Sequence, residues 1–426
     1  MNPSQFGLIS SIYTLGGLLG ALLAGPIATK YGRLLTLRAT TLFFIVGPMA
    51  MALGSNIPAL SFGRLVAGIG SGAAIVVGPI YVSEIAPPSA RGFFGAFTQI
   101  MANVGILLTQ TLGLFMSKGN KWRMILAVGG IIGAVELVGL FLVPESPTWL
   151  AEHHKGTLAR NVLQRIRGKD ADIDGEIADW NIPTGPGNEP GEEEQSLLTE
   201  HASNAPPKEP PVSMLDVLVD PYHRSAIIAV VGVMMAQQFT GINSIVMYSV
   251  SLLQTILPTT AALLTVGISA INLVVTLACS PLPDKIGRRT CLLLSVTGVG
   301  LDSILLAVGI YFNQKALASI AALLFVAFFA LGLGPVPFML ASELVGPEAV
   351  GATQSWALAA NWVATFVVAQ FFPVINDSLG GRGKVYWIFA ILAGLLGGFI
   401  YGYVPETKGK ANVEEVWGRE DQRRRD

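Results

Sequence analysis

The sequence predicts an all-α membrane protein built from two repeated halves. Hydrophobic residues make up 52% of its 426 residues and charged residues only 13%, against about 25% charged residues in average proteins. A chain of this composition lacks the polar side chains to cover itself, so its solvent must be lipid. Three landmarks also recur in the same order: a Gly-Arg pair, a glutamate and a Pro-Glu pair. They are Gly32-Arg33, Glu84 and Pro144-Glu145, then Gly287-Arg288, Glu343 and Pro405-Glu406.

The two sets of landmarks are offset by 255, 259 and 261 residues. A near-constant offset of this length indicates a duplicated domain and not a short solenoid repeat. Two parallel repeats in a membrane protein are typical of transporters that hold one substrate site between their halves.

Eleven apolar segments are each close to the roughly 20 residues that a helix needs to cross a bilayer. They are 7–28, 34–54, 61–82, 92–116, 123–143, 225–253, 260–280, 290–311, 315–341, 350–375 and 384–404. Their length and continuous apolar character exclude barrel strands, so only helices are expected. The 48 glycines agree with this, because small residues let membrane helices approach closely.

The positive charges orient these spans. With the segment after the first span placed inside, 20 Lys and Arg residues fall on the inner side and 7 on the outer side. The C-terminus is then cytosolic and Met1 is outside, without a cleavable signal peptide to bring it there. The repeat agrees, because the counterpart of 225–253 would lie before Met1. We therefore expect that the first helix of the complete fold is absent from this sequence.

The segment 144–224 differs from the rest. Residues 147–168 place apolar side chains at helical spacing among Lys and Arg, and this pattern predicts an amphipathic helix on the cytosolic side. The stretch 183–211 is rich in Pro, Gly and Glu and predicts disorder. Glu193 precedes Leu197-Leu198 with the spacing of an acidic dileucine signal, which sorting adaptors would read. The domains expected are 1–143, the loop 144–224, a second bundle at 225–404 and a tail at 405–426.

Seven strings then carry a resemblance to a known family. They are GRLVAGIGSG (63–72), PIYVSEIAPPSARG (79–92), PESPTWL (144–150), QQFTGINSIVMYS (237–249), DKIGRR (284–289), GLGPVP (332–337) and PETKG (405–409). In this order and spacing the chain resembles the sugar-porter family of the major facilitator superfamily, which includes glucose facilitators and fungal hexose transporters. The resemblance implies the major facilitator fold, two pseudo-symmetric bundles with 12 helices in the complete family fold.

The resemblance also implies a set of charged gating residues at the cytosolic side, which would hold the outward-open state. They are Glu84, Arg91, Asp284, Arg288, Arg289 and Glu343. An Arg–carboxylate pair at the edge of the bilayer is strong but breaks when helices separate. Thr29 stands where the first half would have an Asp, Leu34 where it would have a second Arg, and Gly351 where an Arg usually follows Glu343. Half of this set of gating contacts is therefore expected to be eroded.

Amides inside the apolar spans are the candidate substrate ligands. They are Gln99, Gln237, Gln238, Asn243, Asn272 and Asn361. An amide donates and accepts hydrogen bonds without carrying a charge, as a sugar hydroxyl does. Amides can therefore bind a sugar and still release it. The alternative for each is a hydrogen bond between two helices. The resemblance places the string Gln237-Gln238 to Asn243 at the main sugar-binding position.

Pro335 and Pro337 interrupt a later span together with Gly332 and Gly334. Proline lacks the backbone N–H of the helical ladder, and broken helices near the midplane are where transporters bend and bind. Phe338 stands where the family usually has Trp, and Ala330 where facilitators often have Glu, which leaves the particular sugar open.

Three charged residues remain within the spans: Arg64, Glu136 and Asp302. Carboxylates within a membrane are functional candidates by default, and proton coupling is their candidate role. The alternative is a protonated carboxyl bonded to a neighbouring helix. In proton-coupled relatives the arginine at position 64 faces an Asp on the first helix.

The expected function is transport of a hexose or related sugar, as a facilitator or a proton symporter, in the plasma membrane or a vacuolar or endosomal membrane. Inositol or pentose transport, a non-transporting sugar receptor and an inactive form are the alternatives. The sequence shows no nucleophile–base pair, phosphate loop or metal-ligand spacing, so neither an enzyme nor a cofactor is expected. Cys279 and Cys291 are expected to be buried thiols. The net charge of −1 gives no reason to expect nucleic acid as a partner.

Overall fold

The computed structural model describes residues 3–87, 91–153, 155–169, 171–177, 216–253, 260–346, 349–410 and 413–418. Ten helices in these ranges are long and apolar enough to cross a membrane, and a bent pair, α11 with part of α12, brings the number to eleven. The predicted number of spans and the all-helical class are confirmed. The segment 183–211, expected to be disordered, and the dileucine sequence at Glu193, Leu197 and Leu198 lie outside the described residues.

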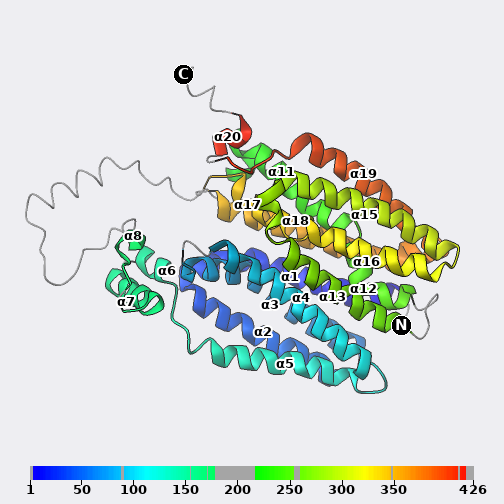
Figure 1. Ribbon diagram of the computed structural model, residues 1–426. Helices are drawn as coiled ribbons and strands as arrows, with labels where there is room; N and C mark the ends of the chain where they lie inside the picture. The colour runs from blue at the N-terminus through cyan, green and yellow to red at the C-terminus, as the bar shows by residue number, and fades with distance from the viewer. Residues whose placement is uncertain are drawn as a thin grey trace, which may run out of the picture.

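Five helices form the first bundle, and three short helices follow it. The bundle consists of α1 (Pro3–Tyr31), α2 (Arg33–Leu53), α3 (Ile57–Ile85), α4 (Arg91–Met116) and α5 (Trp122–Gly139). The short helices α6 (Pro147–Glu152), α7 (Gly156–Arg167) and α8 (Asp174–Ile177) lie at one end of the bundle, which we call the linker end (Figure 1). The N-terminus of α1 lies at the opposite end.

The second bundle is divided into more helices than the first. Its elements are α10 (Asp216–Val219), α11 (Pro221–Phe239), α12 (Ile242–Leu253), α13 (Ala261–Cys279), α14 (Leu282–Ile286), α15 (Arg288–Tyr311), α16 (Lys315–Leu331), α17 (Val336–Glu343), α18 (Val350–Ser378), α19 (Val385–Tyr403) and α20 (Val413–Trp417). The largest cluster of buried apolar side chains lies in this half, and smaller clusters lie in the first half.

The structure shortens or divides several of the expected helices. The helix expected over 123–143 ends at Gly139, because the chain must leave the helix before Pro144, whose ring disfavours helical geometry in the preceding residue. The span expected over 225–253 is two helices, α11 and α12, bent by 41°. The amphipathic stretch 147–168 is also two helices, and Leu158 on α7 is exposed while Ala159 beside it is fully buried.

Glycines allow α1 and α3 to pack closely. Gly16 and Gly20 on α1 face the backbone of α3, and Gly68 and Gly72 on α3 face the backbone of α1, each pair four residues apart. A Cβ on any of these glycines would lie inside contact distance of a carbonyl oxygen on the other helix. The small-residue spacing that lets membrane backbones meet is therefore present on both partners, as the glycine content led us to expect.

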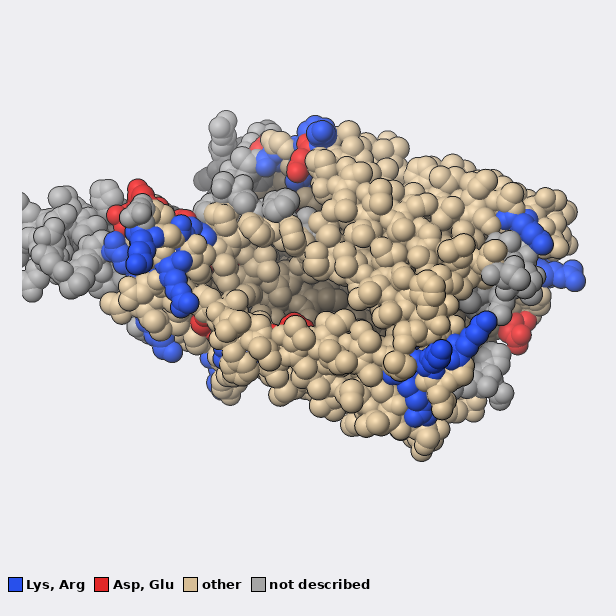
Figure 2. Space-filling view, turned by 60° about the horizontal axis from the view of Figure 1, so that its bottom comes forward, with Lys and Arg blue, Asp and Glu red and all other residues tan. Residues whose placement is uncertain are grey.

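Among the described residues, most contacts between the bundles are made by two helix pairs: α1 with α18, and α4 with α13. On the first pair, Ser11 donates to the Gln370 side chain over 2.6 Å, and Gly17 lies against the ring of Trp362. Figure 2 shows Lys and Arg side chains gathered toward the ends of the molecule, a middle largely without charged residues, and a hollow in that middle. This distribution is the one expected of a chain whose middle lies in lipid. Cys291 is buried as expected, whereas Cys279 at the end of α13 is only partly buried.

Candidate functional site

Four of the predicted amides form one hydrogen-bonded network, the amide network: Gln237, Gln238, Asn243 and Asn361. Gln238 donates to the side-chain oxygens of Gln237 (3.0 Å) and Asn361 (3.2 Å). Asn361 in turn donates to Gln237 over 2.6 Å, and Asn243 donates to Gln238 over 2.5 Å. The network therefore connects α11, α12 and α18 inside the second half. Gln237 and Gln238 are 4% and 8% exposed. Their side-chain amides are therefore almost excluded from solvent and rely on protein partners in this conformation.

A break in the backbone places Asn243 beside Gln238. Helix α11 ends at Phe239, and Gly241 adopts φ +94° before α12 begins. A positive φ at this angle is readily available only to glycine. The ring of Phe389 lies where a Cβ on Gly241 would stand, so both backbone angle and space require glycine here.

A second break supplies acceptors to the same network. Helix α16 ends at Leu331 and α17 begins at Val336, with Pro335 at the junction and Pro337 in the first turn of α17. Because proline has no N–H, Pro337 cannot donate to Leu333 O four residues earlier, and that carbonyl of the preceding turn loses its helical partner. Gln237 donates to two carbonyls of this turn, Leu333 O (2.7 Å) and Gly334 O (3.0 Å). The two breaks in the second half are therefore joined by one buried amide.

The other two predicted amides, Gln99 and Asn272, are not bonded to the amide network by a contact between described residues. Both belong to a second network that crosses from α4 to α13 and includes Asn103 and Thr276. Asn103 donates to Thr276 over 2.9 Å and accepts from Gln99 over 3.3 Å. Asn272 approaches Asn103 at 3.5 Å. Sequence reasoning missed Asn103, although it lies four residues after Gln99 and therefore on the same face of the helix.

At the linker end, Arg288 is the centre of a charge cluster in the second half. Its guanidinium lies 2.8 Å from Asp284 and 2.9 Å from Glu343, with two further contacts to the Glu343 carboxylate. Glu406 accepts from the backbone N–H groups of Arg288 (2.7 Å) and Arg289 (3.1 Å), which are the first two residues of α15. A carboxylate at a helix N-terminus satisfies free N–H donors and complements the helix dipole.

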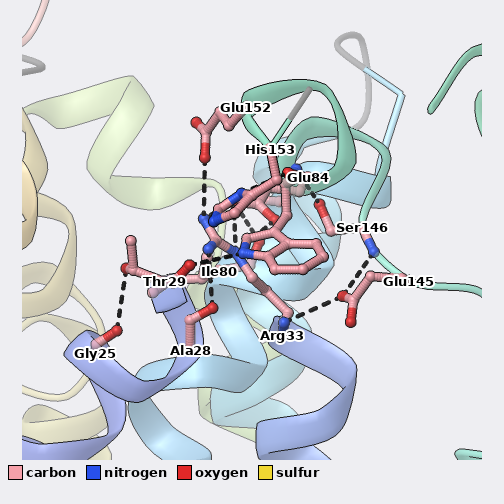
Figure 3. Close-up of polar contacts among 12 residues, drawn as sticks. Gly25, Ala28, Thr29, Arg33, Ile80, Glu84, Glu145, Ser146, Glu152 and His153 are labelled. Carbon is pink, nitrogen blue, oxygen red and sulfur yellow. Dashed lines mark hydrogen bonds and ion pairs between the residues drawn. The ribbon is translucent and has the colours of Figure 1, made fainter. Parts of the chain in front are cut away.

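The first half repeats this cluster around Arg33, as Figure 3 shows. The Arg33 guanidinium contacts Glu84 at 2.8, 3.1 and 3.2 Å. Glu145 accepts from the backbone N–H groups of Arg33 (3.1 Å) and Leu34 (3.0 Å), at the start of α2. The expected erosion of this cluster is therefore partial, because the Arg–Glu pair and the helix cap are both retained. Among the described residues, the ion pairs of the two arginine clusters do not cross from one half to the other.

Sequence reasoning identified Glu84 and Glu343 but missed Arg33, Glu145 and Glu406 as members of these clusters. The signal was present, because all three belong to the repeated landmarks. Arg289 differs from its expected role, since its side chain lies over the ring of Tyr401 and donates to the Tyr401 carbonyl. Helix α4 begins at Arg91, whose side chain lies outside the described set.

The three charged residues of the spans do not meet. Glu136 is exposed on α5. Asp302 on α15 is 3% exposed. It lies on the same helix face as Gly298, which packs against Phe328 of α16. The Oδ2 atom of Asp302 has no hydrogen-bond partner among the described residues. Arg64 on α3 lies near Tyr13 and Tyr248. None of the three is bonded to the amide network by a contact between described residues.

Comparison with known proteins extends across the whole chain. The family model described as "Sugar (and other) transporter" matches residues 2–417. The Probable metabolite transport protein YBR241C of Saccharomyces cerevisiae is 35% identical over 98% of this chain and 83% of its own. The Vacuolar protein sorting-associated protein 73 of the same yeast is 32% identical over 96% of this chain and 82% of its own.

A solved structure shows the same fold. The proton:xylose symporter XylE bound to 6-bromo-6-deoxy-D-glucose matches with a TM-score of 0.76 and 25% identity, over 97% of this chain and 89% of that one. The match runs along nearly the full length of the chain. It agrees with the repeated bundles and with the broken helices of the second half. The chain is a multi-pass membrane protein that belongs to the sugar-transporter family of the major facilitator superfamily.

Proposed function

We propose that this protein carries a hexose or a related sugar across its membrane by alternating access of the two bundles, with the linker end in the cytosol. The amide network carries this proposal. Its four neutral side chains lie where two helices are broken, and they exchange donors and acceptors with one another over 2.5–3.2 Å. Sugar hydroxyls present the same combination of donors and acceptors and can replace these bonds without leaving a buried charge unpaired.

The roles of the remaining residues follow from their places. Glu84, Asp284, Arg288, Arg289 and Glu343 stabilise the linker end of each half, and Pro335 and Pro337 provide the bend that access to the site requires. Gln99 and Asn272, with Asn103, hold α4 against α13 where the two bundles meet. A sugar analogue bound to the structural relative XylE supports a sugar as substrate.

A panel of labelled substrates in proteoliposomes tests the proposal. We expect saturable uptake of a hexose that unlabelled hexoses compete away, and slower uptake of a pentose or of inositol. Faster uptake of inositol or of a pentose would identify that solute, and not a hexose, as the substrate. Uptake no faster than in empty vesicles for every member of the panel would refute transport and favour the receptor or the inactive form.

Coupling to protons is expected to be absent. Glu136 is exposed on α5 and Asp302 is buried on α15, and neither carboxyl is bonded to the amide network by a contact between described residues, so neither would respond directly to bound sugar. Initial uptake should therefore be unchanged by a protonophore and by external pH between about 5.5 and 7.5. Glu136→Gln should retain uptake within about twofold. A protonophore that prevents accumulation above the external concentration would contradict this expectation and return Glu136, Asp302 and Arg64 to consideration.

A further inference from the structure

The two charge clusters at the linker end differ at one position. In the second half, Asp284 lies four residues before Arg288 and pairs with it over 2.8 Å. In the first half Thr29 occupies the equivalent position, and its hydroxyl donates to Gly25 O over 3.1 Å instead of approaching Arg33. Arg33 therefore lacks the carboxylate that the preceding turn supplies to Arg288.

A carboxylate from the linker occupies this gap. The Oε2 atom of Glu152, the last residue of α6, lies 3.9 Å from Nη2 of Arg33, the same guanidinium nitrogen that contacts Glu84 (Figure 3). Asp284 approaches the equivalent Nη2 of Arg288 in the second half. Among the described ion pairs, the first-half cluster thus has two carboxylates, as the second-half cluster does, but one of them comes from the linker.

Helix α6 is held at this place by a hydrogen bond to the backbone of Thr29 and by contacts of its own residues. The indole Nε1 of Trp149 donates to the carbonyl of Thr29 over 2.8 Å, and Trp149 is only 8% exposed. Ser146 caps the helix by accepting from the Trp149 N–H over 3.1 Å. The His153 ring stacks on Trp149 with centroids 4.2 Å apart. These contacts hold Glu152 on the side of Arg33.

We propose that Glu152 is a positioning residue that takes the place of the missing acid beside Arg33, and so makes the first-half cluster depend on the docking of the linker. This rests on the proposed function, because the consequence is that linker movements change the balance between the states of the transport cycle. The Glu152 side chain is 55% exposed, so the pair is screened by water. An ion pair of this kind changes an equilibrium by about 1.5- to 5-fold.

The test asks whether an aspartate at position 29, the counterpart of Asp284, restores what the loss of the Glu152 carboxylate removes. We would compare E152Q, T29D and T29D/E152Q, with D284N alone and D284N/T29D as the matched control in the other half. In proteoliposomes, E152Q should shift the initial rate of uptake by about 1.5- to 5-fold. T29D/E152Q should restore the wild-type rate, whereas T29D should not restore D284N. An effect of E152Q that is equal with and without T29D, or absent in both backgrounds, overturns the proposal.

A second readout does not depend on transport. The melting temperature of the purified protein should fall in E152Q, and this fall should be smaller in the T29D background because both carboxylates act on Arg33. Equal falls in the two backgrounds overturn the role of Glu152. A wild-type protein that transports no sugar refutes the proposed function, and the melting temperatures then decide the role of Glu152 alone.

Discussion

Gln238→Ala is expected to reduce hexose uptake at least tenfold in proteoliposomes that hold equal amounts of protein. Gln238 is the amide network's central residue, since it accepts from Asn243 and donates to Gln237 and Asn361. Alanine removes these bonds and leaves the donor of the partly buried Asn243 without its acceptor. Each unmade bond of this kind costs about 1–3 kcal/mol, and roughly 1.4 kcal/mol corresponds to a factor of ten.

Two further variants separate binding from folding in this experiment. Gln238→Glu keeps the size and the acceptor for Asn243 but loses both donated bonds, so uptake should still fall severalfold. Gln110→Ala removes an amide on α4 that lies outside the amide network and should leave uptake within twofold. If Gln238→Ala reconstitutes normally and takes up hexose at the wild-type rate, the amide network is not the substrate site.

The spans were predictable from sequence because their signal is local. A run of about 20 apolar residues must be a membrane helix wherever it packs. The break at Pro335 was equally visible, since proline interrupts a helix regardless of its neighbours. The break at Gly241 was not, because one glycine in an apolar run is tolerated in a helix. Only the packing of Phe389 against Gly241 shows why the chain bends there.

The candidate site was predictable only in part, because its members come from distant helices. Gln237, Gln238 and Asn243 lie within seven residues, so one bend brings them together. Asn361 joins them only through the packing of α18 against α11. Gln99 appeared equivalent by residue type, yet α4 turns it toward Asn103 and the interface with α13. The helix face, and not the type of side chain, separated the two networks.

The partners of the linker-end arginines illustrate the same limit. The repeat placed Arg33 and Glu84 in one half and Arg288 and Glu343 in the other, but it did not state that each pair is bonded. Sequence comparison emphasised the loss at Thr29, a change within one turn of helix. It could not foresee that Glu152 would approach from a different element, because that contact depends on how α6 docks.

Gly287→Ala is expected to lower the stability of the folded protein markedly. Gly287 adopts φ +99° and ψ +152°, a region that is essentially restricted to glycine, and a side chain there costs about 1–3 kcal/mol in backbone strain. A Cβ would also stand inside contact distance of the Glu406 carboxylate. That carboxylate caps α15 at Arg288 and Arg289, so it cannot withdraw without freeing two N–H donors.

The measurement is the melting temperature of the purified protein, together with the rate of hexose uptake after reconstitution. Both should fall in Gly287→Ala, and Gly32→Ala should behave alike because Gly32 has φ +107° and a Cβ there would lie 2.6 Å from Glu145. Gly398→Ala on α19 is the control, since its Cβ would meet nothing within 4 Å. Alanine also favours a helix over glycine by about 1 kcal/mol, so the control should be neutral or stabilising. A Gly287→Ala protein as stable as the control would show that the carboxylate cap yields without cost. The repeated Gly-Arg and Pro-Glu landmarks would then need a reason other than a shared helix cap.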